Sequence, residues 1–163
     1  MDQATLREIL EYSPETGAFK WIKTLKRNWI GKIAGNIHKK KGYIYIQING
    51  KNYSAHRLAW IYSKGVDSKN QIDHIDGNKT NNRIENLREA TNGQNRANSK
   101  TSNINGLKGV RKLKWIKDGG KCWAAQITIN KKTIYLGTFY SAHEAHLAYC
   151  DAAKKFHGDF FRP

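Results

Sequence analysis

The stretch from residue 67 to residue 100 limits this chain more than any other, because it is too polar to form a hydrophobic core of its own. Asp, Asn, Arg and Lys dominate it, and its apolar residues form two islands, Ile72 and the Ile84/Leu87 pair. Buried polar groups are costly unless they are paired. We therefore expect the polar residues of this stretch to serve chemistry rather than packing.

The preceding 66 residues are more regular and predict a small α+β support. Ile44, Ile46 and Ile48 alternate as in a strand, Asn49-Gly50 is a hairpin-turn signal, and residues 51–54 start the return strand. Ser54 is a candidate cap for a helix over residues 55–62 that ends near Gly65. Residues 5–21 indicate a short helix, a turn at Pro14 and Gly17, and a strand.

A second module is predicted after a linker of small polar residues, which we place at 101–105. Residues 108–115, 123–129 and 133–139 alternate as strands, and helical spacing begins after Ser141, which forms a capping box with Glu144; Gly158 ends the helix. This indicates a three-stranded antiparallel sheet packed on one helix, with a core of Leu136, Phe139, Ala145, Ala148, Tyr149 and Phe156.

Charge indicates the partner. The 163 residues hold 29 Lys and Arg against 13 Asp and Glu, a net charge of +16, spread over both modules. Nucleic acid fits this excess better than a membrane surface, since we find no basic amphipathic helix, lipidation signal, transmembrane stretch or secretory signal. We expect an intracellular protein with no obligate protein partner. Cys122 and Cys150, far apart in sequence, are expected to be reduced and partly buried.

Residues 73–95 contain the candidate catalytic groups. A strand ending at His74, a polar turn, a strand over 84–88 and a helix from about Thr91 place Asp73 and Asn95 at opposite ends of a hairpin–helix unit. Their oxygens are hard ligands suited to Mg²⁺ or Mn²⁺. Adjacent strand residues face opposite sides, so His74 can address a water while Asp73 faces the metal. We expect His74 to act as general base and Asn86 to hold its tautomer by a side-chain hydrogen bond.

The same residues resemble a known family. The run Asp73-His74-Ile75-Asp76-Gly77-Asn78-Lys79, followed by Asn82, Asn86-Leu87-Arg88, Thr91 and Asn95, is similar to the HNH endonuclease motif of phage and intron homing enzymes. The resemblance implies a ββα-metal finger within a nuclease domain of residues 1–100, divided into support (1–66) and finger (67–100). It implies one divalent ion on Asp73 and Asn95, with His74 as base and Asn86 in support. Asn at the last position, often His, disfavours zinc.

The segment from Tyr53 to Trp60 is also similar to the region preceding this motif. Two interpretations remain open for it. In one, His56 and Arg57 contact DNA phosphates near the cut. In the other, Leu58, Ala59 and Trp60 form the core face of a helix and Arg57 is solvated.

Residues 106–163 resemble the ethylene-response-factor (AP-two) DNA-binding domain, through Gly109-Val110-Arg111, residues 123–127, residues 136–139 and the helix from Ala142 to Gly158. The resemblance implies a sheet that enters the major groove. The expected DNA contacts are Arg111, Lys114, Trp115, Trp123, Gln126, Lys131 and Lys132. Arg111 suits guanine and the lysines suit phosphate. Trp123 has an equal claim to a role in covering the helix.

We therefore expect a metal-dependent HNH endonuclease that cuts double-stranded DNA, of the homing or phage-encoded type, in the cytoplasm of a bacterial host if phage-encoded. With one motif per chain, a monomer would nick. The alternative is a non-catalytic DNA-binding transcriptional regulator with a degenerate nuclease finger.

Overall fold

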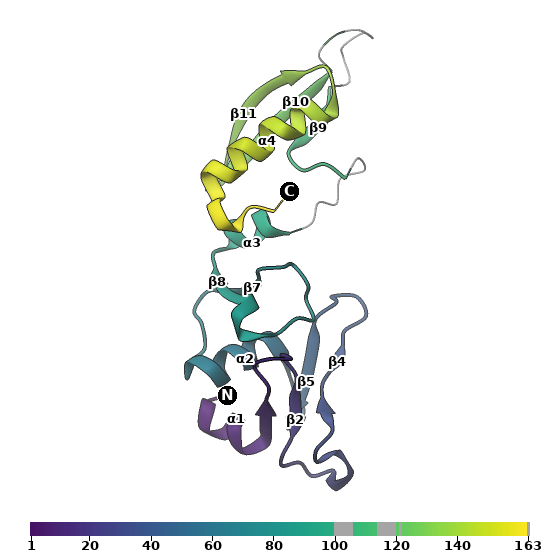
Figure 1. Cartoon of the computed structure of the whole chain (residues 1–163), viewed down its shortest axis with the longest axis vertical. Helices are drawn as coiled ribbons and strands as arrows, with labels where there is room; N and C mark the ends of the chain where they lie inside the picture. The colour runs from purple at the N-terminus through teal and green to yellow at the C-terminus, as the bar shows by residue number, and fades with distance from the viewer. Residues whose placement is uncertain (100–105, 114–119, 121, 163) are drawn as a thin grey trace. The chain divides into compact units, whose positions relative to one another are not determined.

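The computed structural model describes residues 1–99, 106–113, 120 and 122–162. It has the predicted mixed α+β composition and forms two compact units, Met1–Thr91 and Asn92–Pro163 (Figure 1). The second unit begins earlier than the boundary expected at residue 100, because the short helix α3 groups with the C-terminal residues. The proposed linker, 101–105, lies outside the described residues. No helix in the described part of the chain is long and apolar enough to cross a membrane.

The first unit opens with a helix and a small antiparallel sheet. Its elements are α1 (Gln3–Ile9), β1 (Leu10–Tyr12), β2 (Phe19–Trp21), the 3₁₀ helix η1 (Arg27–Trp29) and β3 (Ile33–Ala34). The strand order is β1-β2-β3. The predicted helix, turn and strand are present, and β1 is an additional strand before the turn. It alternates buried and exposed residues over only three positions, which is too short for a periodic signal.

The next sheet carries the predicted hairpin. It consists of β4 (Asn36–Ile37), β5 (Ile44–Ile48) and β6 (Lys51–Ser54), in the order β4-β5-β6. Asn49 and Gly50 both adopt positive φ, as a two-residue hairpin turn requires. Helix α2 (Ala55–Lys64) follows and ends at Gly65 in the left-handed conformation, as predicted. Ser54 occupies the cap position but makes no side-chain capping bond.

The polar stretch folds as a two-stranded hairpin of β7 (Gln71–His74) and β8 (Leu87–Ala90). The 3₁₀ helix η2 (Ile84–Asn86) lies in the connection, directly before β8. The strand expected over 84–88 therefore begins only at Leu87, since the amide of Asn86 bonds back to the carbonyl of Arg83 in a tight turn. Ile72 and Leu87 join the core of the first unit. The polar stretch thus packs its few apolar side chains into the core formed by residues 1–66.

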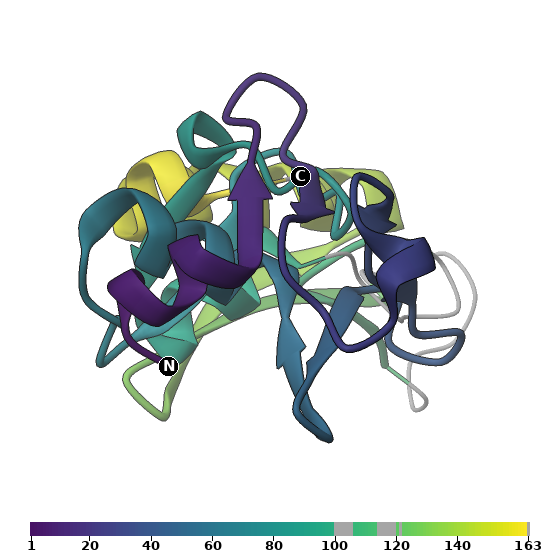
Figure 2. The same ribbon diagram turned by 90° about the horizontal axis from the view of Figure 1, so that it is seen from below.

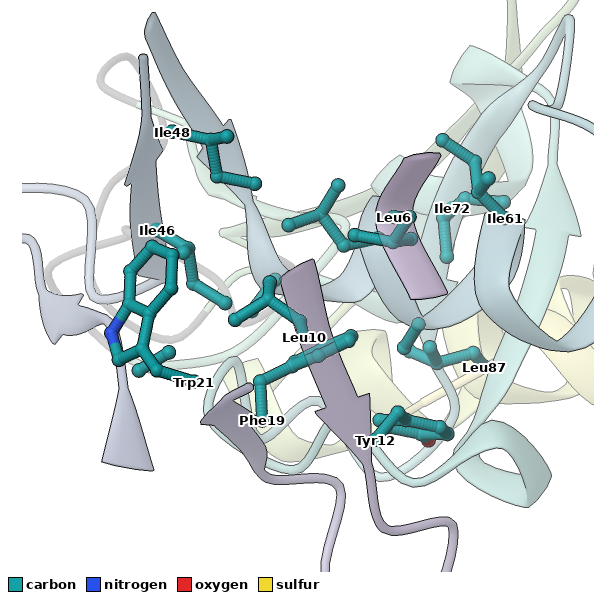
Figure 3. Packing of buried hydrophobic residues seen from close by; sticks show 14 residues of the cluster. Leu6, Leu10, Tyr12, Phe19, Trp21, Ile46, Ile48, Ile61, Ile72 and Leu87 are labelled. Carbon is teal, nitrogen blue, oxygen red and sulfur yellow. The ribbon is translucent and has the colours of Figure 1, made fainter. Parts of the chain in front are cut away.

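That core gathers side chains from every part of the first unit. Figure 3 shows Leu6 and Leu10 at its centre, with Trp21 beside Ile46. Tyr12, Phe19, Ile61 and Leu87 belong to the same cluster. Helices α1 and α2 lie side by side in both views (Figures 1 and 2). The site hairpin is therefore mounted on a packed scaffold, to which residues 1–66 contribute most of the apolar surface.

The second unit consists of α3 (Asn92–Asn98), β9 (Val110–Lys112), β10 (Trp123–Ile129), β11 (Lys132–Phe139), α4 (Ala142–His157) and η3 (Gly158–Phe160). The sheet order is β11-β10-β9, and α4 packs against the sheet. The buried Nζ of Lys108 donates to the carbonyl of Ala97, which ties α3 to this unit. Ser141 caps α4 by accepting from the amide of Glu144, as predicted.

The predicted core of the second unit is partly correct. Ala145 and Tyr149 are buried, Leu136, Phe139 and Ala148 are half-buried, and Phe156 is 50% exposed. The helical spacing predicts Phe156 in the core, but it lies in the last turn of α4, where its side chain stays half exposed. Both cysteines are free and partly buried, as expected.

Candidate active site

Asp73 and His74 are the last two residues of β7. The antiparallel register places Asp73 opposite Arg88 and His74 opposite Leu87. Both Asp73 and His74 are buried, at 5% and 3% exposure. A carboxylate and an imidazole with so little water around them need defined partners, since burial of either group is otherwise unfavourable.

The turn after His74 is fixed by a network centred on Asp76. Its carboxylate accepts from the amide of Asn78 and from the side chains of Asn81 (2.7 Å) and Asn86 (2.9 Å). The Asn86 side chain also accepts from the amide of Asp76 and donates to the carbonyl of Asn81. Burial opposes ionisation of Asp76, but the hydrogen bonds outweigh it and lower its pKa. The Asp-Gly-Asn sequence thus forms a rigid loop.

The imidazole of His74 is held by Asn82. Its Nε2 lies 3.0 Å from Oδ1 of Asn82. Because a carbonyl oxygen only accepts, this contact is a hydrogen bond in the tautomer that carries the proton on Nε2, and in that tautomer Nδ1 is the basic nitrogen. Burial lowers the pKa of His74 and outweighs the Asn82 bond and the nearby carboxylates, which raise it. A neutral imidazole is the form that takes a proton from water.

This arrangement corrects the role expected for Asn86. Its side chain is fully used by Asp76 and Asn81, so it holds the loop and not the ring. The amide that meets the ring belongs to Asn82, which is only 1% exposed. Both positions are Asn in an Asn-rich turn, so spacing did not distinguish them. Only the path of the loop shows which amide reaches the imidazole.

The N-terminal hairpin holds Asn82 in place. The hydroxyl of Tyr12 donates to the carbonyl of Asn82 at 2.7 Å, in the interior. Gly17 lies so close that a Cβ there would stand 2.6 Å from the carbonyl carbon of Asn82. Sequence reasoning missed both residues, because they lie about seventy positions away. Gly17 also has a positive φ of 72°, which side chains disfavour. This φ and the lack of room for a Cβ together explain why glycine occupies that position.

Asp73 forms an ion pair with Arg88 on the neighbouring strand β8. Nε and Nη2 of Arg88 lie 3.1 and 3.0 Å from its Oδ2. A carboxylate oxygen is a hard ligand of the kind that a divalent cation prefers, but in this structure Arg88 already balances the charge of Asp73. The second expected ligand, Asn95, lies on α3 in the other unit, so joint coordination stays a prediction. Within the described residues, no group of three or more His, Cys, Asp or Glu side chains gathers at a metal-binding point.

The structure favours the packing interpretation for the start of α2. Leu58 and Ala59 are fully buried. Arg57 donates to the carboxylate of Asp67 and to the carbonyls of Ser68 and Asn70, so its guanidinium ties down the next loop instead of being solvated. These bonds leave the phosphate contact expected for Arg57 without support.

His56 lies against the His74 ring. The ring centroids are 5.1 Å apart, edge to face, and the ring of Tyr43 contacts both imidazoles. Burial, with the charges of His74 and Arg57, lowers the pKa of His56 to about 3. His56 is therefore neutral at physiological pH and does not offer the positive charge of the expected phosphate contact.

Two residues near the site were missed by sequence reasoning. Lys79 donates to the carbonyl of Lys41 and lies 4.8 Å above the ring of Tyr43. The Asp-Gly-Asn-Lys turn was a visible signal for Lys79, whereas nothing in the strand pattern marked Tyr43. Together they place an exposed cation next to the aromatic cluster around His74.

In the second unit, the expected DNA contacts separate by sheet face. Arg111 pairs with Ala124 in register, so it shares a face with Gln126. Trp123 alternates onto the face of Ile127, which packs on α4, and the Nζ of Lys112 lies 5.8 Å over its ring, so both roles stay open for Trp123. Across from Gln126 lies Tyr135, 61% exposed, which sequence reasoning missed. Lys131 and Lys132 are exposed at the turn; Lys114 and Trp115 lie outside the described residues.

A buried carboxylate and imidazole on a hydrogen-bonded hairpin, in a basic protein, are groups that can serve hydrolysis of an anionic substrate. Comparison with known families agrees with this class. Residues 53–97 match the family described as HNH endonuclease, over α2, the β7–β8 hairpin and most of α3. The matched residues, which include Asp73, His74 and Asn82, are similar to this family.

Individual proteins are similar over part of the chain. Protein 3.8 of Escherichia phage T7 is 40% identical over 80 residues, which is 47% of this chain and 63% of that protein. A structure reported under the words "DNA binding and cleavage by the HNH homing endonuclease I-HmuI" matches with 33% identity and a TM-score of 0.42. That match covers 56% of this chain and 51% of the other, so the chain spans about half to two thirds of these relatives.

Proposed function

We propose that the protein is a metal-dependent DNA endonuclease that hydrolyses phosphodiester bonds, of the homing or phage-encoded type. The observation that carries this proposal is the buried imidazole of His74, held through Nε2 by Asn82 and adjacent to the carboxylate of Asp73. The family match over residues 53–97 supports it.

In the proposed reaction, His74 accepts a proton from a water at Nδ1 as the water oxygen attacks phosphorus, and the P–O bond to the leaving oxygen breaks. Asp73 and Asn95 would hold one Mg²⁺ or Mn²⁺ ion. When bound, that ion supplies positive charge at the scissile phosphate and the leaving oxygen. Asn82 keeps the imidazole in the tautomer that the step needs.

The second unit supplies affinity for double-stranded DNA in this proposal. Arg111, Gln126 and Tyr135 share the sheet face that does not carry Ile127 and α4. Such a face offers an arginine for guanine or phosphate and an exposed aromatic ring, as an AP-two-like module would. Lys131 and Lys132 extend its positive charge.

Plasmid nicking tests the proposal. Supercoiled DNA with Mg²⁺ or Mn²⁺ should be nicked by the wild-type chain, and chelator should abolish nicking. His74→Ala should bind DNA as the wild type does but fail to cut it. Binding without cleavage in either metal would instead identify a non-catalytic DNA-binding regulator. Arg111→Ala should weaken DNA binding, whereas Lys155→Ala, an exposed charge at the end of α4, should lower it much less.

A further inference from the structure

Arg88 faces the carboxylate that the proposed metal needs. It lies directly opposite Asp73 in the β7–β8 register, and two of its nitrogens meet the same oxygen, Oδ2, at 3.0 and 3.1 Å. The side chains are 16% and 6% exposed. The pairing is therefore set by the sheet and is poorly screened by water.

We propose that Arg88 couples metal binding to DNA binding. In the free protein its guanidinium holds Asp73; in the DNA complex it binds a backbone phosphate, and Asp73 becomes available to the metal. This inference rests on the proposed endonuclease function, and it assigns Arg88 a regulatory and phosphate-binding role at the same site.

The physical reason is competition between two cations for one carboxylate. A divalent ion on Asp73 would lie within a few ångströms of the guanidinium, where like charges repel strongly in a poorly solvated site. The competition ends only if Arg88 finds another anion. A phosphodiester is a suitable one, because its oxygens match the planar donor pair of arginine. DNA would thus raise metal affinity, and metal would raise DNA affinity by the same factor.

Mn²⁺ titration tests the coupling without relying on cleavage. In a His74→Ala background, Mn²⁺ binding is measured by calorimetry at one low ionic strength, with and without a mixed-sequence DNA duplex. We expect the duplex to tighten Mn²⁺ binding at least tenfold. Adding Arg88→Gln should tighten binding at least tenfold in the absence of DNA and reduce the gain from DNA to less than threefold.

Two further variants separate charge from folding. Arg83→Gln removes an exposed arginine of the same hairpin, which makes a long ion pair with Glu85 at 3.9 Å, and should leave both Mn²⁺ affinities unchanged. Arg88→Lys keeps the positive charge and should bind Mn²⁺ in the absence of DNA as weakly as the wild type.

The outcomes distinguish this inference from the proposed function. If Arg88→Gln binds Mn²⁺ no more tightly than the parent without DNA, or if Arg88→Lys binds it as tightly as Arg88→Gln, the coupling role is wrong while the endonuclease proposal stands. If no chain binds Mn²⁺ with or without DNA, both the coupling and the metal-dependent function are wrong.

Discussion

Replacing Asn82 by leucine should abolish most activity at almost no cost in stability. In the wild type, Oδ1 of Asn82 meets Nε2 of His74, while its Nδ2 is buried without a hydrogen-bond partner in the described structure. Leucine has a similar volume and removes that unsatisfied donor, but leaves Nε2 of His74 unsatisfied instead. Each such group costs about 1–3 kcal/mol, so the two effects offset to within about 1 kcal/mol.

Activity has no such compensation. Without Asn82 the imidazole loses the bond that fixes its tautomer and orientation. Loss of a partner of this kind lowers activity about 10- to 100-fold. We expect the loss in kcat, with KM for DNA unchanged, because Asn82 is buried and has no access to the substrate.

Asn86→Leu is the matched control. It is the same substitution in the same loop, but the Asn86 side chain makes three hydrogen bonds, with the amide and carboxylate of Asp76 and the carbonyl of Asn81. At about 1 kcal/mol each, the loop should lose about 3 kcal/mol of stability.

Urea unfolding measures stability, plasmid nicking at saturating DNA measures kcat, and ¹⁵N chemical shifts of the His74 ring report its tautomer. The reasoning fails if Asn82→Leu keeps wild-type kcat and tautomer. It also fails if Asn82→Leu is as unstable as Asn86→Leu.

Three further predictions concern stability. Burial raises the pKa of Tyr12 to about 12, so the folded state holds this proton more tightly than the unfolded chain does. The free energy of unfolding should therefore fall by about 2–3 kcal/mol as pH rises from 10 to 12. Urea unfolding at several pH values should show that Tyr12→Phe removes this part of the pH dependence. Gly109→Ala places a Cβ 2.0 Å from the Tyr149 ring at a φ of +71°, and should cost about 2–5 kcal/mol. Gly106→Ala has a similar φ and no atom of the described residues within 4 Å of the new Cβ, so it should cost only about 1–2 kcal/mol; thermal unfolding measures both. Arg57→Gln should cost about 1 kcal/mol after allowance for its partial exposure, and hydrogen exchange should rise in residues 67–70 and not at α1.

Local patterns in the sequence determined much of the fold. Alternating isoleucines and Asn49-Gly50 predicted the β5–β6 hairpin, and Ser141, Glu144 and Gly158 predicted the limits of α4. These signals act between near neighbours, where turn conformation, capping and periodicity are decided by adjacent residues. The strand ending at His74 was predictable for the same reason.

The assembly of the site was decided by contacts between distant residues. Which amide holds His74, the support of Asn82 by Tyr12 and Gly17, and the packing of His56 on His74 all depend on how the loop and hairpins pack. The pairing of Asp73 with Arg88 depends likewise on a register fixed across fifteen positions. The sequence alone thus determined which residues can perform the chemistry. Only tertiary packing decided which of them meet, because a contact between remote positions leaves no periodic trace in the chain.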